Sequence, residues 1–189
     1  MKVLSSVVES FQDFPSQDGS SIVVYFVGCE HACIGCHNPE LQCAWSFPES
    51  NYSENGTSTE VYYDPLRLLK VIKGWSQKYR TSKVVLSGGD PLHPFNRAGV
   101  ASLLGDNAML NYNLEFCLYT GYDAASVQRM NIKDFKYLKC GKYDETLAQT
   151  PEKTDEHFKL SSSNQELYDS NFNLLSTEGV FYFTKEQKQ

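Results

Sequence analysis

The chain has 189 residues, of which 41% are hydrophobic, 13% aromatic and 21% charged. This length and composition fit one folded domain over residues 1–189 and exclude a disordered chain. The formal net charge of −6 leaves no basic face, so we expect no nucleic-acid binding. The longest apolar run covers only residues 22–27, and the N-terminal segment lacks the apolar core of a signal peptide. We therefore expect a cytoplasmic protein that does not enter the membrane.

Strands and helices are predicted to alternate along the chain. The β-branched and aromatic run Ile22–Val27 predicts a buried strand, and the polar residues 42–63 predict an exposed loop or an irregular hairpin. Asp64 and Pro65 predict a helix start, because apolar residues then recur with helical spacing from Leu68 to Tyr79. The later predicted elements are a strand at Lys83–Leu86, a helix at Asn96–Leu104 closed by Gly105, a strand that ends before Gly121, a strand at Phe135–Leu138 before Gly141, and a last strand within residues 179–183.

This alternation is typical of parallel βαβ units, whose ligand sites lie beyond the carboxyl ends of the strands. A complete eightfold barrel takes about 250 residues, more than this chain has. We therefore expect an α/β fold with an open, partial (β/α) barrel, in which a mostly parallel sheet has its helices outside. Four loops that follow predicted strands would meet at one edge of the sheet: the cysteine motif at 29–36, Ser87–Asp90, Thr120–Gly121 and Cys140–Lys142.

Three of the six cysteines, Cys29, Cys33 and Cys36, lie within eight positions. A disulfide framework is disfavoured, because a cytoplasmic domain of this size needs no covalent staple. Structural zinc normally takes four protein ligands, so it would need His31 or His37 as well. A 4Fe-4S cluster is ordinarily held by four thiolates, and three would leave one iron open to a substrate. The spacing alone leaves zinc and the iron-sulfur cluster both open.

The pattern CxxxCxxC after the first strand resembles the signature of the radical S-adenosylmethionine enzymes. With "SGGDPLHP", "YTGY" and "SSNQ", the chain is similar over most of its length to the activating proteins of anaerobic (class III) ribonucleotide reductases. The resemblance implies cleavage of S-adenosylmethionine at a 4Fe-4S cluster to a 5'-deoxyadenosyl radical. It also implies a glycyl radical installed on the large subunit of the reductase, and a flavodoxin- or ferredoxin-type electron donor.

The resemblance further implies roles for individual residues. The three cysteines would hold the cluster, and the amino and carboxylate groups of S-adenosylmethionine would bind its fourth iron. Gly35 and His37 flank the last cysteine, and the imidazole would lie along the adenine; an ordinary loop histidine is the alternative. The other implied contacts are Ser87, Gly88, Gly89 and Asp90 near the methionine amino group, Thr120 near the ribose or carboxylate, and Lys142 near the carboxylate. Without the cysteines, a tight Gly-Gly turn and a turn-capping threonine would explain these residues equally well.

Some positions depart from the family pattern or stay open. Related sequences often have aspartate where Cys140 stands, and Asn164 and Gln165 would contact cofactor or partner. Cys43 and Cys117 resemble ordinary core or loop residues. Another radical S-adenosylmethionine enzyme, such as the activase of a different glycyl-radical enzyme or a small-molecule deazapurine synthase, would share the cysteines and glycines. A zinc-bound interaction module without catalysis would share only the cysteines.

Overall fold

The computed structural model describes residues 1–42 and 60–184. Its central sheet consists of β1 (Lys2–Ser10), β2 (Ser21–Phe26), β3 (Glu60–Tyr62), β4 (Lys83–Gly88), β5 (Glu115–Tyr119), β6 (Tyr137–Cys140) and β9 (Glu166–Asp169). The strand order is β3-β1-β2-β4-β5-β6-β9. The four strands from β2 to β6 run parallel, whereas β1, β3 and β9 pair antiparallel at the edges. The α/β class and the parallel centre are confirmed, and the described strands form an open sheet rather than a closed barrel.

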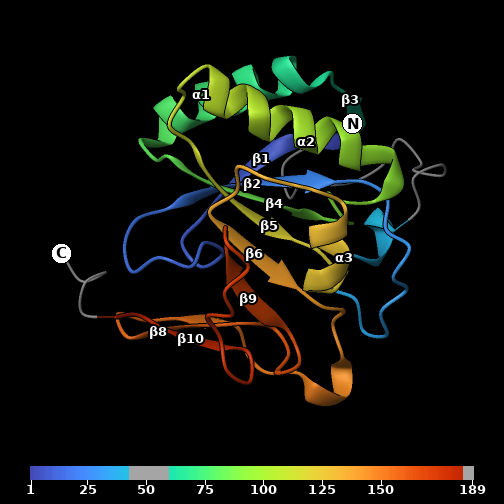
Figure 1. Ribbon diagram of the computed structural model, residues 1–189, viewed down its shortest axis with the longest axis vertical. Coiled ribbons are helices and arrows are strands. Elements are labelled where there is room, and N and C mark those ends of the chain that lie inside the picture. Colours follow the sequence, from blue (N-terminus) through green and yellow to red (C-terminus); the bar gives the residue numbers. More distant parts are fainter. Residues whose placement is uncertain (43–59, 185–189) are drawn as a thin grey trace.

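Two long helices cover one face of this sheet (Figure 1). The first, α1 (Pro65–Tyr79), begins where the sequence predicts, because the Asp64 side chain accepts a hydrogen bond from the Arg67 amide at 2.9 Å. It ends at Arg80, whose φ of 52° is left-handed. Among the described residues, no helix is long and apolar enough to cross a bilayer.

The second long helix, α2 (Pro94–Met109), extends beyond the predicted segment at both ends. Gly105 was expected to close it but lies within it. The real end is fixed by Asn107, whose side chain donates to the Leu114 carbonyl at 3.0 Å and accepts from the Leu114 amide at 3.3 Å. Tertiary hydrogen bonds therefore override the helix-breaking tendency of one glycine, which is only about 1 kcal/mol.

The edge strands beside β2 differ from the prediction. No strand was predicted in the N-terminal segment, yet β1 pairs with β2 through a register shift between Val3 and Val7. The segment 42–63, predicted as an exposed loop or an irregular hairpin, contains β3, whose Val61 pairs with Val3 of β1. Residues 43–59 of that loop, with Cys43, lie outside the described residues.

The C-terminal part forms a second, three-stranded sheet on the side of the main sheet opposite α1 and α2 (Figure 1). The predicted strand within 179–183 is confirmed as one of its members. Its apolar side chains form a small separate core with Leu167 of β9. The remaining elements are α3 (Ala124–Arg129), β7 (Glu152–Lys153), β8 (His157–Lys159), β10 (Val180–Tyr182) and the 3-10 turns at Pro39–Leu41 and Glu145–Leu147.

Alternate residues of the parallel strands face opposite sides of the sheet. Under the helices, residues such as Val24, Leu86 and Leu118 form the main core and are at most 1% exposed. The other face carries smaller apolar residues near its centre, including Cys117, with tyrosines around them. This second face leads to the candidate site.

Candidate functional site

A pocket of about 320 Å³ lies at the carboxyl ends of the parallel strands. Each of the four loops that were expected to meet there contributes to its wall. The parallel sheet thus brings together segments more than 100 positions apart in the sequence. The predicted site residues that line it are Cys29, Cys33, Cys36, His37, Ser87, Gly88, Gly89 and Thr120, whereas Gly35, Asp90 and Lys142 do not.

The cysteine loop is fixed by backbone hydrogen bonds to segments on both sides of it. The Cys29 amide donates to the carbonyl of Gln42 at 2.9 Å, and the Gly28 carbonyl accepts from the Asp90 amide at 2.8 Å. All three thiols are partly exposed. Burial, as the main cause, raises the pKa of the Cys29 thiol to about 11. Metal ligation requires the thiolate, which a bound cation stabilises.

The arrangement of donors fits an iron-sulfur cluster. Cys29, Cys33 and Cys36 line one pocket, but no three His, Cys, Asp or Glu side chains in residues 1–42 and 60–184 group around a single ion. A 4Fe-4S cubane takes each thiolate on a different iron, so its ligands surround it rather than meet at one point. Three thiolates leave one iron for an outside ligand.

The two histidines considered as a fourth zinc ligand have other neighbours. His31 is buried, and its Nε2 lies 2.7 Å from Asp90 Oδ2. The His37 ring packs at 4.7 Å, centroid to centroid, on the ring of Tyr143. Since His31 is already bonded to a carboxylate, its geometry favours a supporting role for this residue.

The glycine pair at the end of β4 is required by the protein's own backbone. Gly88 has a φ of +102°, and a Cβ there would lie 2.6 Å from the backbone of Phe26. A Cβ on Gly89 would lie 2.6 Å from the carbonyl oxygen of Gly28. The pair therefore lets the end of β4 pack directly under the cysteine loop. The predicted contact of these glycines with S-adenosylmethionine stays a prediction.

Asp90 is buried beneath the pocket, with 1% of its surface exposed. Both oxygens of its carboxylate accept hydrogen bonds. It accepts hydrogen bonds from the Thr120 hydroxyl at 2.8 and 3.0 Å, from the Leu92 amide at 2.7 Å and from the Gly121 amide at 3.0 Å. His31 is its fourth neighbour. The carboxylate thus joins the ends of β4 and β5 to the cysteine loop.

No local sequence pattern predicts the part that His31 plays in this wall. Its ring lies edge-on to Tyr122, with centroids 4.5 Å apart, and a Cβ on Gly121 would clash with it. Its position between Cys29 and Cys33 predicts metal binding rather than the bond to Asp90 that the structure shows.

The loop after β6 carries Lys142 and is held by two polar residues that precede β9. The predicted contact of Lys142 with the cofactor carboxylate stays a prediction. Lys142 is exposed, and its carbonyl accepts a hydrogen bond from Asn164 Nδ2 at 2.9 Å. Gln165 donates to the Gly141 carbonyl at 3.3 Å, so these two polar residues brace the loop. Cys140, at the position where relatives often carry aspartate, is 1% exposed in the core under the helices.

Lys139, which was not among the predicted site residues, does line the pocket. It stands between Leu138 and Cys140, both of which face the helices. Strand alternation therefore directs Lys139 to the opposite, pocket side. Desolvation lowers its pKa to about 8. The alternation of "YLKC" was the signal that could have identified it.

Comparisons with known proteins bear on this site. A protein-family model described as a 4Fe-4S single cluster domain matches residues 17–168. The anaerobic ribonucleoside-triphosphate reductase-activating protein of Enterobacteria phage T4 is 25% identical over 138 residues, which cover 71% of this chain and 78% of that protein. The protein of that name from Pasteurella multocida is 26% identical over 141 residues, covering 72% and 82%. The one from Haemophilus influenzae is 33% identical over 85 residues, covering 44% and 46%. The chain belongs to the 4Fe-4S single cluster domain family and is similar, within it, to activating proteins of anaerobic ribonucleoside-triphosphate reductases.

Proposed function

We propose that this protein is the activating enzyme of an anaerobic ribonucleotide reductase and that it generates a glycyl radical on that partner. The observation that carries the proposal is the pocket in which Cys29, Cys33 and Cys36 face the carboxyl ends of four parallel strands. The names of its relatives support the choice of partner.

Cys29, Cys33 and Cys36 would hold a 4Fe-4S cluster with one iron left for the amino and carboxylate groups of S-adenosylmethionine. When bound and reduced, such a cluster supplies one electron that splits the sulfonium into methionine and a 5'-deoxyadenosyl radical, which takes a hydrogen atom from a backbone glycine of the reductase. The electron comes from a flavodoxin- or ferredoxin-type donor.

The other pocket residues would bind and shield the cofactor. Ser87, Gly88 and Gly89 end β4 beside the cysteine loop, in reach of a ligand amino group, and Thr120 presents its hydroxyl at the end of β5. His37 stands on the cysteine loop where it would meet an adenine ring. Tyr119 also lines the pocket and would help to keep water from the reactive region.

The open sheet supports a protein substrate. We infer that residues 1–189 form a single domain with a partial barrel of the radical S-adenosylmethionine type, because four parallel strands end at one pocket while the sheet stays open beyond β9. A backbone loop of the reductase would enter from the open side and complete the wall. The proposal includes a cytoplasmic location and no membrane or nucleic-acid partner.

The proposal is tested by reconstituting the protein with iron and sulfide under strict exclusion of oxygen. The reconstituted protein is incubated with S-adenosylmethionine, a reductant and the reductase, and the glycyl radical is measured by electron paramagnetic resonance. We expect a radical doublet with the wild type and none with Cys29→Ala. Cys140→Ala, which removes a buried thiol on the helix side, is the matched control and should retain it.

The other outcomes separate the alternatives. Cleavage of S-adenosylmethionine without a radical on the reductase would indicate the activase of another glycyl-radical enzyme or a small-molecule enzyme. Zinc without labile sulfide in the anaerobically purified protein would indicate the interaction module and contradict the proposal.

A further inference from the structure

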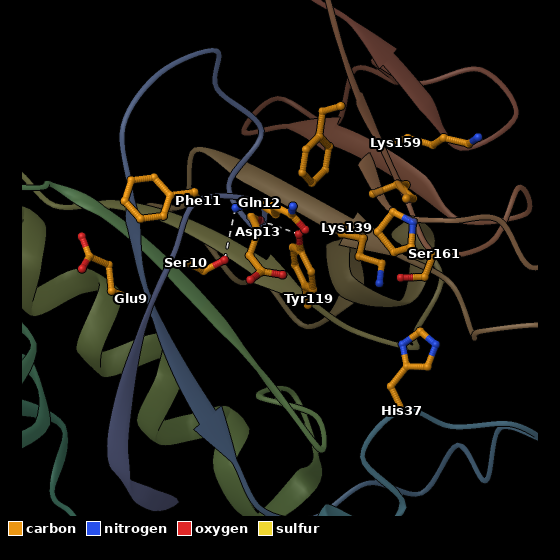
Figure 2. Close-up of a pocket in the computed structure, with 13 residues that line it drawn as sticks. Glu9, Ser10, Phe11, Gln12, Asp13, His37, Tyr119, Lys139, Lys159 and Ser161 are labelled. Carbon is orange, nitrogen blue, oxygen red and sulfur yellow. Dashed lines mark hydrogen bonds between the residues drawn. The ribbon is translucent and has the colours of Figure 1, made fainter. Parts of the chain in front are cut away.

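The cysteine loop is held differently in its two halves. The half that ends at His37 borders a second cavity of about 490 Å³, and Figure 2 shows the His37 ring directed into that cavity, across from Lys139 and Ser161. Ile34, in the same half, is 79% exposed. Within residues 1–42 and 60–184, the His37 ring has no hydrogen bond and packs only on Tyr143. Few side-chain contacts therefore fix this half of the loop.

The half nearer the start of the loop is anchored through Glu30 and His31, which lie between the first two cysteines. The His31 ring is buried, and its Nε2 lies 2.7 Å from Asp90 Oδ2. The Glu30 carboxylate accepts a hydrogen bond from the Tyr122 hydroxyl. These two contacts span 59 and 92 positions of the sequence, so they tie the loop to the turns that follow β4 and β5.

The turn after β5 is shaped to receive the imidazole of His31. A Cβ on Gly121 would clash with the ring, and Tyr122 packs edge-on against it with centroids 4.5 Å apart. The Thr120 hydroxyl donates to Asp90 at 2.8 Å and accepts from the Tyr122 amide at 3.2 Å. Each residue of the run "TGY" thus contacts either the imidazole or the carboxylate that holds it.

The backbone directly after His31 is strained. Ala32 has a φ of 49°, in the left-handed region that a residue with a Cβ rarely adopts. Such a conformation persists only where the surrounding structure holds it. On the other side of Ala32, Cys33 is partly exposed and Ile34 is exposed. The buried His31 side chain is therefore the contact that fixes this bend.

We propose that His31 is a positioning residue, which anchors the segment between Cys29 and Cys33 on Asp90 and so keeps these two thiolates in place around the cluster. The inference rests on the part of the proposed function that assigns a 4Fe-4S cluster to the three cysteines. A site with three protein thiolates has one ligand fewer than usual to retain its cluster, so a loop that is held in advance matters more. His31 itself ligates no iron and takes no part in electron or hydrogen transfer.

The first test uses the apo-protein. His31→Leu keeps a side chain of similar size and removes the bond to Asp90, whereas His31→Gln places an amide donor within reach of the same carboxylate. We expect amide hydrogen exchange in residues 28–33 to be about tenfold faster in His31→Leu and within about threefold of wild type in His31→Gln. His157→Leu removes another histidine–carboxylate contact, to Glu152 at 3.3 Å, and as the matched control should leave this exchange unchanged.

The second test measures how well the cluster is retained. The reconstituted proteins are mixed anaerobically with the ferrous chelator bathophenanthroline disulfonate, and iron release is followed by absorbance. We expect release to be about tenfold faster in His31→Leu and within about threefold of wild type in His31→Gln. Leu118→Ala, which weakens the core under the helices and leaves the loop intact, should release iron within about twofold of the wild-type rate.

A second variant keeps the test decisive if the leucine variant does not fold. The amide of His31→Asn is one methylene too short to reach Asp90, so this variant should behave like His31→Leu. Equal rates of exchange and iron release in the asparagine and glutamine variants would overturn the inference.

The remaining outcomes separate positioning from general support of the fold. Equal acceleration of iron release in His31→Leu and Leu118→Ala would mean that His31 only stabilises the domain, which would overturn the inference. Wild-type exchange and iron release in His31→Leu would overturn it too, while the proposed function stands. A wild-type protein that takes up no 4Fe-4S cluster would contradict the proposed function and this inference with it.

Discussion

The two faces of the central sheet are made from neighbouring residues of the same strands, yet they serve different purposes. On β5, Phe116 and Leu118 face the helices and are at most 1% exposed, whereas Tyr119 faces the pocket. On β6, Leu138 faces the helices and Lys139 the pocket. One face is a continuous apolar core, and the other combines a smaller buried cluster, with Val23, Val85 and Cys117, with the hydroxyls and the ammonium group that line the pocket.

From this difference we expect that single substitutions can change stability and ligand binding separately. Truncation on the helix face should lower the free energy of unfolding, because it leaves a cavity. A conservative change on the pocket face should alter ligand binding while the fold persists. The predictions below examine this division.

The largest effect is expected under the helices. Leu118→Ala should lower the free energy of unfolding by about 3 kcal/mol, since a fully buried leucine is removed from a close-packed core. Ser87→Ala on the pocket face should change it by less than about 1 kcal/mol. Urea denaturation of both variants measures this. Equal losses in the two variants would show that the two faces do not divide stability from binding.

At Asp90, the stability of the fold and the binding of the cluster should depend on the same hydrogen bonds. Asp90→Ala leaves His31, Thr120 and two backbone amides without their acceptor, so we expect a loss of about 2–3 kcal/mol together with lower cluster content. Asp155→Ala, an exposed carboxylate, is the control and should change stability by less than about 0.5 kcal/mol. Wild-type stability and cluster content in the Asp90 variant would refute the bracing role.

The smallest expected effect is a gain in stability on the outer side of the molecule. A Cβ on Gly105 of α2 would meet nothing within 4 Å. Gly105→Ala should therefore stabilise the protein by about 0.5–1 kcal/mol without any change in ligand binding. Thermal unfolding measures the gain, and a destabilised variant would show that α2 needs a glycine there for another reason.

The sequence predicted those parts of the fold that depend on local pattern. The buried strand at Ile22–Val27, the Asp64 cap and the glycines that follow β4 and β5 all indicate their elements directly, and the parallel topology then brings the cysteine loop and Ser87–Gly89 to one edge. The spacing of the three cysteines is also a local pattern, and it indicated a metal or cluster site.

The rest depends on contacts that no local pattern encodes. β1 lacks clear alternation because its pairing with β2 is irregular, and the end of α2 is fixed by Asn107 rather than by Gly105. The pairing of His31 with Asp90 joins residues 59 positions apart. The motif "CGK" at 140–142 indicates Lys142, whereas only the alternation of β6 indicates that Lys139 faces the pocket.

The central claim is that the pocket holds a cubane with three protein thiolates and one open iron. Its most direct test is the electron paramagnetic resonance spectrum of the reduced, anaerobically reconstituted protein, recorded with and without S-adenosylmethionine. The account predicts a 4Fe-4S signal that shifts when the ligand is added and that is lost in Cys29→Ala. A 4Fe-4S signal that the ligand leaves unchanged at saturating concentration, or the absence of any such signal in the wild type, would contradict it.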